Sequence, residues 1–245
     1  MTVVRPFELP DGRLVVQLIT LGPGLCGGDV VRIAVTAEEG ARVVVTTTSA
    51  TKILSMADDR HAEQHVVLHA ADGTTLEYYP ALTIPFPGSA LTQTVTVTAA
   101  PTARVGVTEC WALGRVARGE YLAFRSLASR TTLTVDGRLV YADALDLDPA
   151  VTDVAGAGVL SNRRYLAAGF WLGADGIATD PTSDDFTRRI EDTTDVAFGQ
   201  SAPGLVYLRA LGDDGPAMDA AVQRSVELAS LAWGVAPVRL DRFRC

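Results

Sequence analysis

Residues 91–98 read LTQTVTVT, a stretch in which every second residue is a threonine and most of the others are apolar. Such alternation is typical of a β-strand with one buried face. Four more stretches rich in Val, Ile and Thr lie between Gly, Asp and Pro residues: Val30–Thr36, Arg42–Thr48, Gln64–His69 and Arg104–Thr108. Because β-branched residues favour strands, we predict a mainly β fold of half-buried strands from Leu14 to about Tyr141.

A tight turn is predicted at Asp136-Gly137, which separates two apolar runs within Thr131–Tyr141. This dipeptide takes the positive φ angles of a two-residue turn, so we expect a β-hairpin there. Other turn signals recur roughly every thirty residues, at Glu38-Glu39-Gly40, Ala71-Asp72-Gly73 and Ala100-Pro101. The strands between these turns are not copies of one another, and we infer no sequence repeat.

A helix is predicted near the C-terminus, where Ala217–Trp233 is rich in Ala, Leu, Val and Met. Pro216 stands at its beginning and Gly234 just after its end, and these positions suit proline and glycine respectively. In the polar segment Thr179–Thr194, helix and loop are not separable by pattern. The expected fold is therefore mainly β, with a C-terminal helix.

The composition indicates a folded protein, because 48% of the 245 residues are hydrophobic and 20% are charged. A mainly β chain of this length commonly forms one domain, which we expect to span residues 1–245. The formal net charge of −8 argues against nucleic acid or an anionic membrane as partner.

The cysteines indicate a reducing compartment, because Cys26, Cys110 and Cys245 cannot all pair and form no CxxC motif. Residues 1–9 lack the basic and apolar segments of a leader, and no apolar run is long enough to span a bilayer. We expect a cytoplasmic protein.

The three histidines, His61, His65 and His69, are spaced four residues apart. On a helix this spacing would bring them to one face, within reach of one metal ion. On a strand, residues four apart are separated by about 13 Å, which is too far for a shared ion. The alternating pattern of Gln64–His69 favours an exposed strand face over a metal site.

The glycine-rich loop of residues 22–29 requires sharp turns or a close approach of the backbone. It lacks the Gly-Lys-Ser/Thr of a phosphate-binding loop, and a strand follows it instead of a helix. We interpret it as a structural turn in which the carboxylate of Asp29 accepts hydrogen bonds from loop amides.

Two further stretches carry reactive or charged side chains. Thr46–Lys52 reads TTTSATK, but no partner base is evident and no GxSxG motif occurs, so a hydrolase using Ser49 or Thr47 is a minor alternative. Charges are dense in Glu109–Glu120, and their spacing fits either an exposed ion-paired rim or a buried polar passage.

Four motifs, taken in order, resemble the UreD (UreH) family of urease accessory proteins. They are Gly27-Gly28-Asp29, TTTSATK at Thr46–Lys52, LEYYP at Leu76–Pro80 and GRVARGE at Gly114–Glu120. The resemblance covers about residues 21–147, and Val206–Gly212 before the C-terminal helix is also similar. It implies a β-helical stack of strands with about two helices and no catalytic activity.

The resemblance further implies binding to UreF, to the GTPase UreG through UreF, and to apo-urease, into which nickel is inserted. An internal polar passage for nickel is expected, with no tightly bound cofactor and no resident metal. The candidate passage residues are Asp29, Thr47, Ser49, Glu109 and Glu120. The motif residues expected to support the structure are Gly27, Gly28, Lys52, Glu77, Pro80, Gly114, Arg115, Arg118 and Gly119. Oxygen donors of this kind hold nickel less firmly than imidazole or thiolate, as a conduit requires.

The chain departs from the family pattern in three places. The loop Gly22-Pro23-Gly24 lacks a second proline and a further glycine, and the strand residues expected before Arg5 are few. After Pro80 the family has a glutamine and an acidic residue, where this chain has Ala81 and Leu82. These departures indicate a divergent member of the family. The alternative is a β-rich interaction module unrelated to urease.

Overall fold

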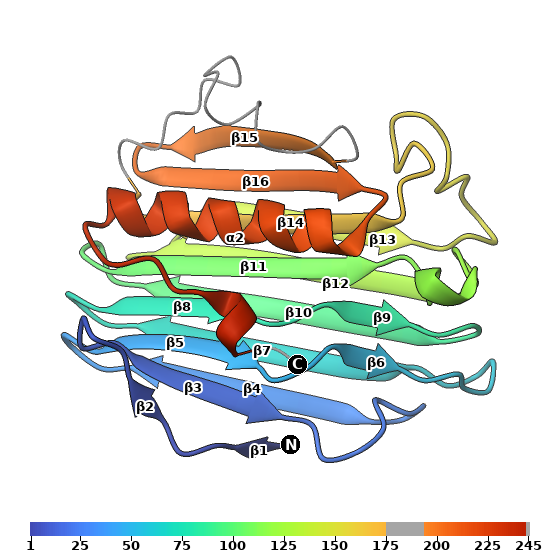
Figure 1. Ribbon diagram of the computed structural model, residues 1–245, viewed down its shortest axis with the longest axis horizontal. Coiled ribbons are helices and arrows are strands. Elements are labelled where there is room, and N and C mark those ends of the chain that lie inside the picture. Colours follow the sequence, from blue (N-terminus) through green and yellow to red (C-terminus); the bar gives the residue numbers. More distant parts are fainter. Residues whose placement is uncertain (175–193, 244–245) are drawn as a thin grey trace.

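In the N-terminal half the chain passes repeatedly from one of two stacked β-sheets to the other, so it winds as a β-helix (Figure 1). The computed structural model describes residues 1–174 and 194–243. Strands of successive coils pair in parallel within each sheet. The mainly β, stacked-strand prediction is confirmed.

The larger sheet, called sheet A, contains eleven strands among the described residues, and its main order is β1-β3-β5-β8-β11-β14-β16-β15. Strand β2 pairs with β3, while β6 pairs with β9 and β9 with β11. The bounds are β1 Thr2–Val3, β2 Phe7–Glu8, β3 Leu14–Ile19, β5 Arg42–Thr47, β6 Thr51–Ile53, β8 Thr75–Tyr79, β9 Thr83–Pro85, β11 Arg104–Ala112, β14 Tyr165–Leu172, β15 Thr194–Ala202 and β16 Leu205–Gly212.

The smaller sheet, called sheet B, has the order β13-β12-β10-β7-β4. Its strands are β4 Val30–Ala37, β7 Ala62–Ala70, β10 Ala90–Ala99, β12 Ser126–Val135 and β13 Arg138–Leu147. The hairpin between β12 and β13 turns at Asp136 and Gly137, whose φ angles are +47° and +73°. The predicted hairpin is confirmed.

The recurring turn signals mark successive coils of the β-helix, although the strands between them differ in sequence. The amide of Gly40 donates to the carbonyl of Asp72 at 3.0 Å. The amide of Gly73 in turn donates to the hydroxyl of Thr102, 29 residues later, at 2.9 Å. These bonds stack the turns at one end of the molecule, so the spacing reflects a repeat of structure.

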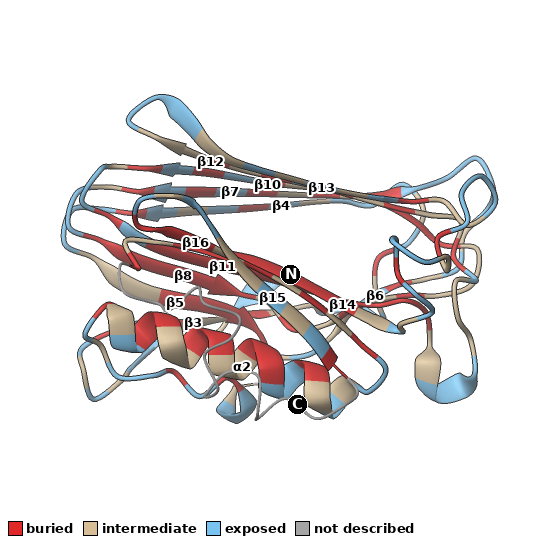
Figure 2. Cartoon of the chain, turned by 90° about the horizontal axis from the view of Figure 1, so that it is seen from above, coloured by how far each residue is buried: buried red, intermediate tan, exposed pale blue. Residues whose placement is uncertain are grey.

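Sheet B has one buried face, as the alternation predicts. In β10, Val95 and Val97 are fully buried, whereas Thr92, Thr96 and Thr98 are exposed. Figure 2 shows sheet B as the outer layer, with sheet A beneath it and the helix α2, Gly215–Ala232, beneath sheet A. The valines therefore contact sheet A and the threonines face solvent.

Sheet A is buried on both faces along β5, β8 and β11, so the half-buried prediction is wrong for β5 and β11. Val45 is 1% exposed and packs between the sheets, while its neighbour Val44 is 0% exposed and packs on the side of α2. The reason is tertiary, because α2 and the chain after it cover the face of sheet A that points away from sheet B (Figure 2).

The predicted C-terminal helix is confirmed as α2, Gly215–Ala232. Asp214 caps it by accepting a hydrogen bond from the amide of Ala217 at 2.9 Å, and Pro216 lies in its first turn. In residues 1–174 and 194–243 it is the one α-helix, beside two 3₁₀ turns, η1 Val116–Arg118 and η2 Leu240–Arg242. The ambiguous segment Thr179–Thr194 lies outside the described residues, except for Thr194.

None of the described helices combines the length and hydropathy that crossing a bilayer would require.

Candidate functional site

A row of polar side chains crosses the apolar space between the two sheets. It is formed by one or two residues from each of several neighbouring strands, and we call it the polar row. Its members are Gln64 of β7, Gln93 of β10, Glu109 of β11, Ser129 and Thr131 of β12, Asp143 of β13 and Arg209 of β16.

The polar row follows from strand alternation and register. On β10, Gln93 lies two residues from Leu91 and two from Val95, so all three point into the space between the sheets. Leu91 and Val95 belong to two different apolar clusters. Because Gln64 is directly opposite Gln93 in the register, the amides align and separate the two apolar clusters.

Glu109 is the centre of this row. Its Oε1 accepts hydrogen bonds from the Nε2 of Gln93 at 2.5 Å and the hydroxyl of Ser129 at 2.8 Å. Its Oε2 accepts a third from the hydroxyl of Thr131 at 2.5 Å. Gln93 is held in turn by the Nε2 of Gln64, which donates to its Oε1 at 2.8 Å. Three donors thus offset part of the cost of burying this carboxyl group.

Burial raises the pKa of Glu109, and the nearby Asp143 carboxylate raises it further, although the three hydrogen bonds oppose the shift. The carboxyl group therefore holds a proton more firmly than an exposed glutamate. A cation that binds Glu109 must therefore displace this proton, or bind at a pH at which the carboxyl group is already ionised.

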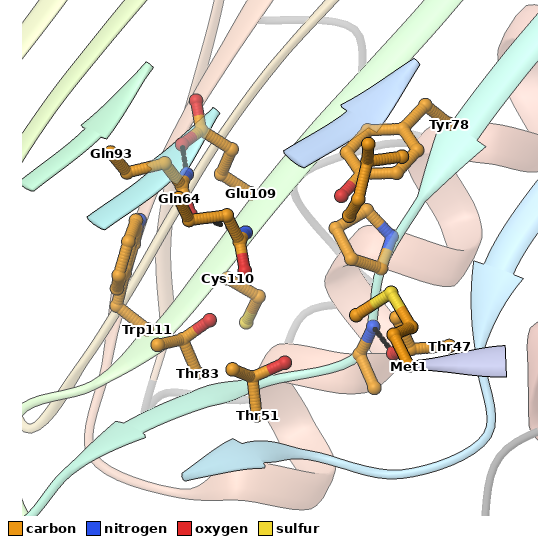
Figure 3. Close-up of a pocket in the computed structure, with 13 residues that line it drawn as sticks. Met1, Thr47, Thr51, Gln64, Tyr78, Thr83, Gln93, Glu109, Cys110 and Trp111 are labelled. Atoms are coloured by element: carbon orange, nitrogen blue, oxygen red, sulfur yellow. Dashed lines mark hydrogen bonds between the residues drawn. The ribbon is translucent and has the colours of Figure 1, made fainter. Parts of the chain in front are cut away.

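Two small cavities flank Glu109, each with a volume of about 10 Å³, which is room for about one water-sized particle. The first is also lined by Thr47, Thr51, Thr83 and the two glutamines (Figure 3). We call it the threonine cavity. The second, between Glu109 and Arg209, is called the arginine cavity. Glu109 lines both.

The arginine cavity ends at an ion pair between the two sheets. Arg209 of β16 donates from Nη2 to Oδ1 of Asp143 on β13. Ala168 of β14 lies between Arg209 and Glu109 in the register of sheet A and also lines this cavity. The small side chain of Ala168 therefore leaves open the space between the two charged residues.

The threonine cavity lies where the strands of sheet A are interrupted. Strands β5 and β6 lie end to end there, as do β8 and β9 (Figure 1). The hydroxyl of Thr47 bridges the two breaks, because it donates to the carbonyl of Ser49 at 3.1 Å and accepts from the amide of Ala81 at 2.8 Å. Pro80 and Ala81 both line the cavity.

The departure after Pro80 has a visible consequence. Ala81 is buried at the threonine cavity, and Leu82 lies on the other side of sheet A. Among the described residues that line the threonine cavity, Glu109 is the one carboxylate.

The structure brings Thr47 and Glu109 to the same cavity but leaves the other three candidates elsewhere. Asp29 is exposed in the glycine loop, where its carboxylate accepts from the amide of Cys26 at 2.7 Å, as the structural interpretation predicts. Ser49 is exposed, and Glu120 is ion-paired with Arg115. None of these three lines either cavity.

The motif residues other than Glu77 occupy three regions. Gly27 and Gly28 lie beside Arg60 in the glycine loop. Pro80 lines the threonine cavity. The remaining charged and glycine residues of the GRVARGE motif, with Lys52, lie together near η1: Lys52, Gly114, Arg115, Arg118 and Gly119.

Glu77 forms a buried ion pair on the other side of sheet A from the polar row. Its Oε1 accepts from Nη1 of Arg13 at 2.5 Å, and both side chains are 0% exposed. Arg13 also donates to Oδ2 of Asp11 and to the carbonyl of Ala236, in the segment after α2. The pair therefore joins the beginning and the end of the chain across sheet A.

His65 and His69 lie on β7, so the exposed strand face predicted for them is confirmed. Nδ1 of His65 is hydrogen-bonded to the hydroxyl of Thr94 on β10 at 2.9 Å, and Nδ1 of His69 to that of Thr98 at 2.8 Å. No group of three metal-binding side chains occurs in residues 1–174 and 194–243. Cys26 is exposed and Cys110 is buried.

Sequence reasoning missed six members of the polar row: Gln64, Gln93, Ser129, Thr131, Asp143 and Arg209. A signal exists for the glutamines, because each stands in the apolar phase of an alternating strand, 29 residues from the other. Asp143 and Arg209 are brought together by the packing of the two sheets, across 66 residues of sequence.

Comparison with known proteins matches the whole chain, residues 1–245, to a family model described as UreD urease accessory protein. A urease accessory protein UreD of Deinococcus radiodurans is 35% identical over 243 residues, which is 99% of this chain and 86% of that protein. One from Actinomyces naeslundii is 31% identical over 98% and 88% of the two chains. Urease accessory protein UreD 1 of a Synechococcus strain is 44% identical over 70% and 64%.

Proposed function

The chain belongs to the UreD family of urease accessory proteins, and on this premise we propose that it serves urease maturation as a scaffold and as a conduit for nickel. The observation that carries the conduit is Glu109, a buried carboxyl group between two cavities in a row of polar side chains. An apolar protein interior would otherwise present no ligand to a divalent cation.

The chemistry of the polar row suits a cation in transit. Its donors are carboxylate, amide and hydroxyl oxygens, which bind nickel more weakly than thiolate or imidazole. Nickel reaching Glu109 replaces a proton there, because burial raises the pKa of this carboxyl group. The ion then passes Ala168 toward Asp143, from which it displaces the guanidinium of Arg209.

The scaffold part of the proposal concerns partners. The chain binds UreF, which carries the GTPase UreG, and the assembly docks on apo-urease in the cytoplasm. Three cysteines that cannot all pair and form no CxxC motif suit that compartment. The chain contributes no turnover of its own.

The test is co-expression of the chain with UreF, UreG and apo-urease, followed by pull-down, nickel analysis of the urease and an activity assay. The informative variant is Glu109→Gln, which keeps the shape of the side chain but removes its charge. Glu63→Gln, on the exposed face of β7, is the matched control. We expect the wild-type chain and both variants to recover the assembly with UreF, UreG and apo-urease. The urease made with Glu109→Gln should have nickel contents near those found without the chain.

Two results would count against the proposal in different ways. If the wild-type chain recovers neither UreF nor apo-urease, the scaffold is wrong. If the assembly forms and Glu109→Gln loads urease with nickel as well as wild type does, the scaffold stands and the conduit is wrong.

A further inference from the structure

The GRVARGE motif and Lys52 lie outside the polar row, yet the structure holds them in a defined conformation. Gly114 has a φ of +130°, and a Cβ atom there would lie 2.5 Å from the carbonyl oxygen of Glu120. Nε of Arg115 donates to Oε2 of Glu120 at 2.6 Å, which closes the turn. Between these contacts, η1 has no buried residue. The motif therefore builds a fixed turn whose side chains are presented outward.

This turn forms one wall of a groove of about 390 Å³ on the α2 side of sheet A. The turn is the short green helix at the right of Figure 1, after the end of β11. The floor of the groove is largely apolar and includes Leu82, Ile84, Phe86 and Tyr165. The guanidinium of Arg115 lies over the ring of Phe86, 4.5 Å from its centroid, and so belongs to the groove as well.

The charge of the groove is opposite to that of the chain. The protein has a formal net charge of −8, but the charged residues that line the groove are Lys52, Arg115 and Arg118. Glu120 neutralises Arg115. Lys52, the single lysine of the chain, and Arg118 have no ion pair with a described residue. Glu120 also interacts with Arg118 through its charge, but in the described part of the chain neither Lys52 nor Arg118 is within ion-pair distance of a carboxylate. Two cations therefore stand beside an apolar floor.

We propose that this groove binds an acidic segment of a protein partner, which places carboxylates against Lys52 and Arg118 and one apolar side chain on the floor. This inference rests on the proposed function, because the partner belongs to the urease maturation assembly. A concave apolar floor with cations at its edge fits a peptide segment, and the acidic remainder of the chain disfavours a nucleic acid.

The test uses purified UreF and purified apo-urease as separate probes, with affinity measured by calorimetry at low and high salt. The double variant Lys52→Glu and Arg118→Glu reverses both free cations. Its matched control is Arg104→Glu with Arg138→Glu, which changes the net charge equally at two exposed positions outside the groove. Val116→Ser, on η1, tests the apolar contact without changing charge.

We expect the groove variant to weaken binding to one of the probes by at least about tenfold, because like charges at an interface are strongly unfavourable. The control should bind within about twofold of wild type, as expected for charges remote from an interface. High salt should lower the affinity of the wild-type chain toward that of the double variant Lys52→Glu and Arg118→Glu, because salt screens charges. The uncharged variant Val116→Ser should bind more weakly than wild type at both salt concentrations. Thermal melting of each variant verifies folding.

The inference is overturned if wild type binds a probe and the groove variant binds both probes as tightly as wild type. That outcome leaves the proposed function intact. If wild type binds neither probe, the proposed function fails, and the groove assignment fails with it.

Discussion

The two sheets of this protein are built from similar Val- and Thr-rich strands, yet they differ in how many faces they bury. In β7 of sheet B, Val66 is 0% exposed and its neighbour Val67 is 49% exposed. In β5 of sheet A, the neighbours Val44 and Val45 are 0% and 1% exposed. The difference arises because α2 and the C-terminal segment cover sheet A, whereas the outer face of sheet B meets solvent. Strand composition alone therefore does not report the number of buried faces.

The largest expected loss of stability comes from breaking the buried ion pair at sheet A, in comparison with an exposed ion pair of sheet B. Arg13→Met should lower the free energy of unfolding by about 3–5 kcal/mol, because it leaves Glu77 buried without its cation. Arg130→Met in sheet B should cost at most about 1 kcal/mol, because the Arg130–Asp146 pair is exposed. Urea denaturation measures both. Equal losses in the free energy of unfolding for the two variants would mean that the face of sheet A under α2 is exposed to solvent.

A set of four Val→Ala substitutions tests burial directly. Val44→Ala, Val45→Ala and Val66→Ala should each destabilise the protein by roughly 2 kcal/mol, because each removes fully buried methyl groups. Val67→Ala should change stability by no more than about 0.5 kcal/mol. The stabilities of the four variants are compared by the midpoints of their urea denaturation curves. A small effect at Val44 with a large one at Val45 would show that α2 does not cover β5.

A pH series tests the polar row between the sheets. Burial raises the pKa of Glu109, so the folded state holds this proton more firmly than the unfolded state does. The contribution of protonated Glu109 to the stability of the protein is therefore fully present below the ordinary glutamate pKa. It is lost as the pH rises through the pKa of Glu109 in the folded state. The loss amounts to about 1.4 kcal/mol for each pH unit that separates the pKa of the folded state from that of the unfolded state.

Glu109→Gln lacks this titration and should gain stability relative to wild type as pH rises from about 4 to 8. Urea denaturation at each pH gives the difference between the two proteins. A difference that stays constant across the series would show that Glu109 titrates like an exposed carboxyl group.

The smallest expected effect is on the outer face of sheet B. The double variant His65→Asn and His69→Asn should unfold within about 0.5 kcal/mol of wild type, because both side chains lie on an open sheet face. Nickel titration should also be unchanged, since strand residues four apart are about 13 Å from each other. A nickel site lost in this variant would restore the metal interpretation of the histidine spacing.

The candidate site was only partly accessible from sequence. Glu109 and Thr47 were identified through the family resemblance, whereas Asp29 proved to bond within its own loop. Gln64 and Gln93 could have been found, because each interrupts the apolar phase of a strand. Asp143 and Arg209 could not, because no local pattern relates two residues that meet across the sheets.

Five strands between Val30 and Thr108, the Asp136-Gly137 hairpin, the C-terminal helix and the family could be predicted from the sequence, because each depends on local preferences or on ordered motifs. Alternation also determined which side of β10 faces solvent, since a strand pleat sends successive side chains to opposite faces. The tertiary structure decided that sheet A is buried twice and that side chains from several strands align as one polar row. Those features depend on hydrogen-bond register and on the packing of α2, which are set by contacts between residues far apart in the chain.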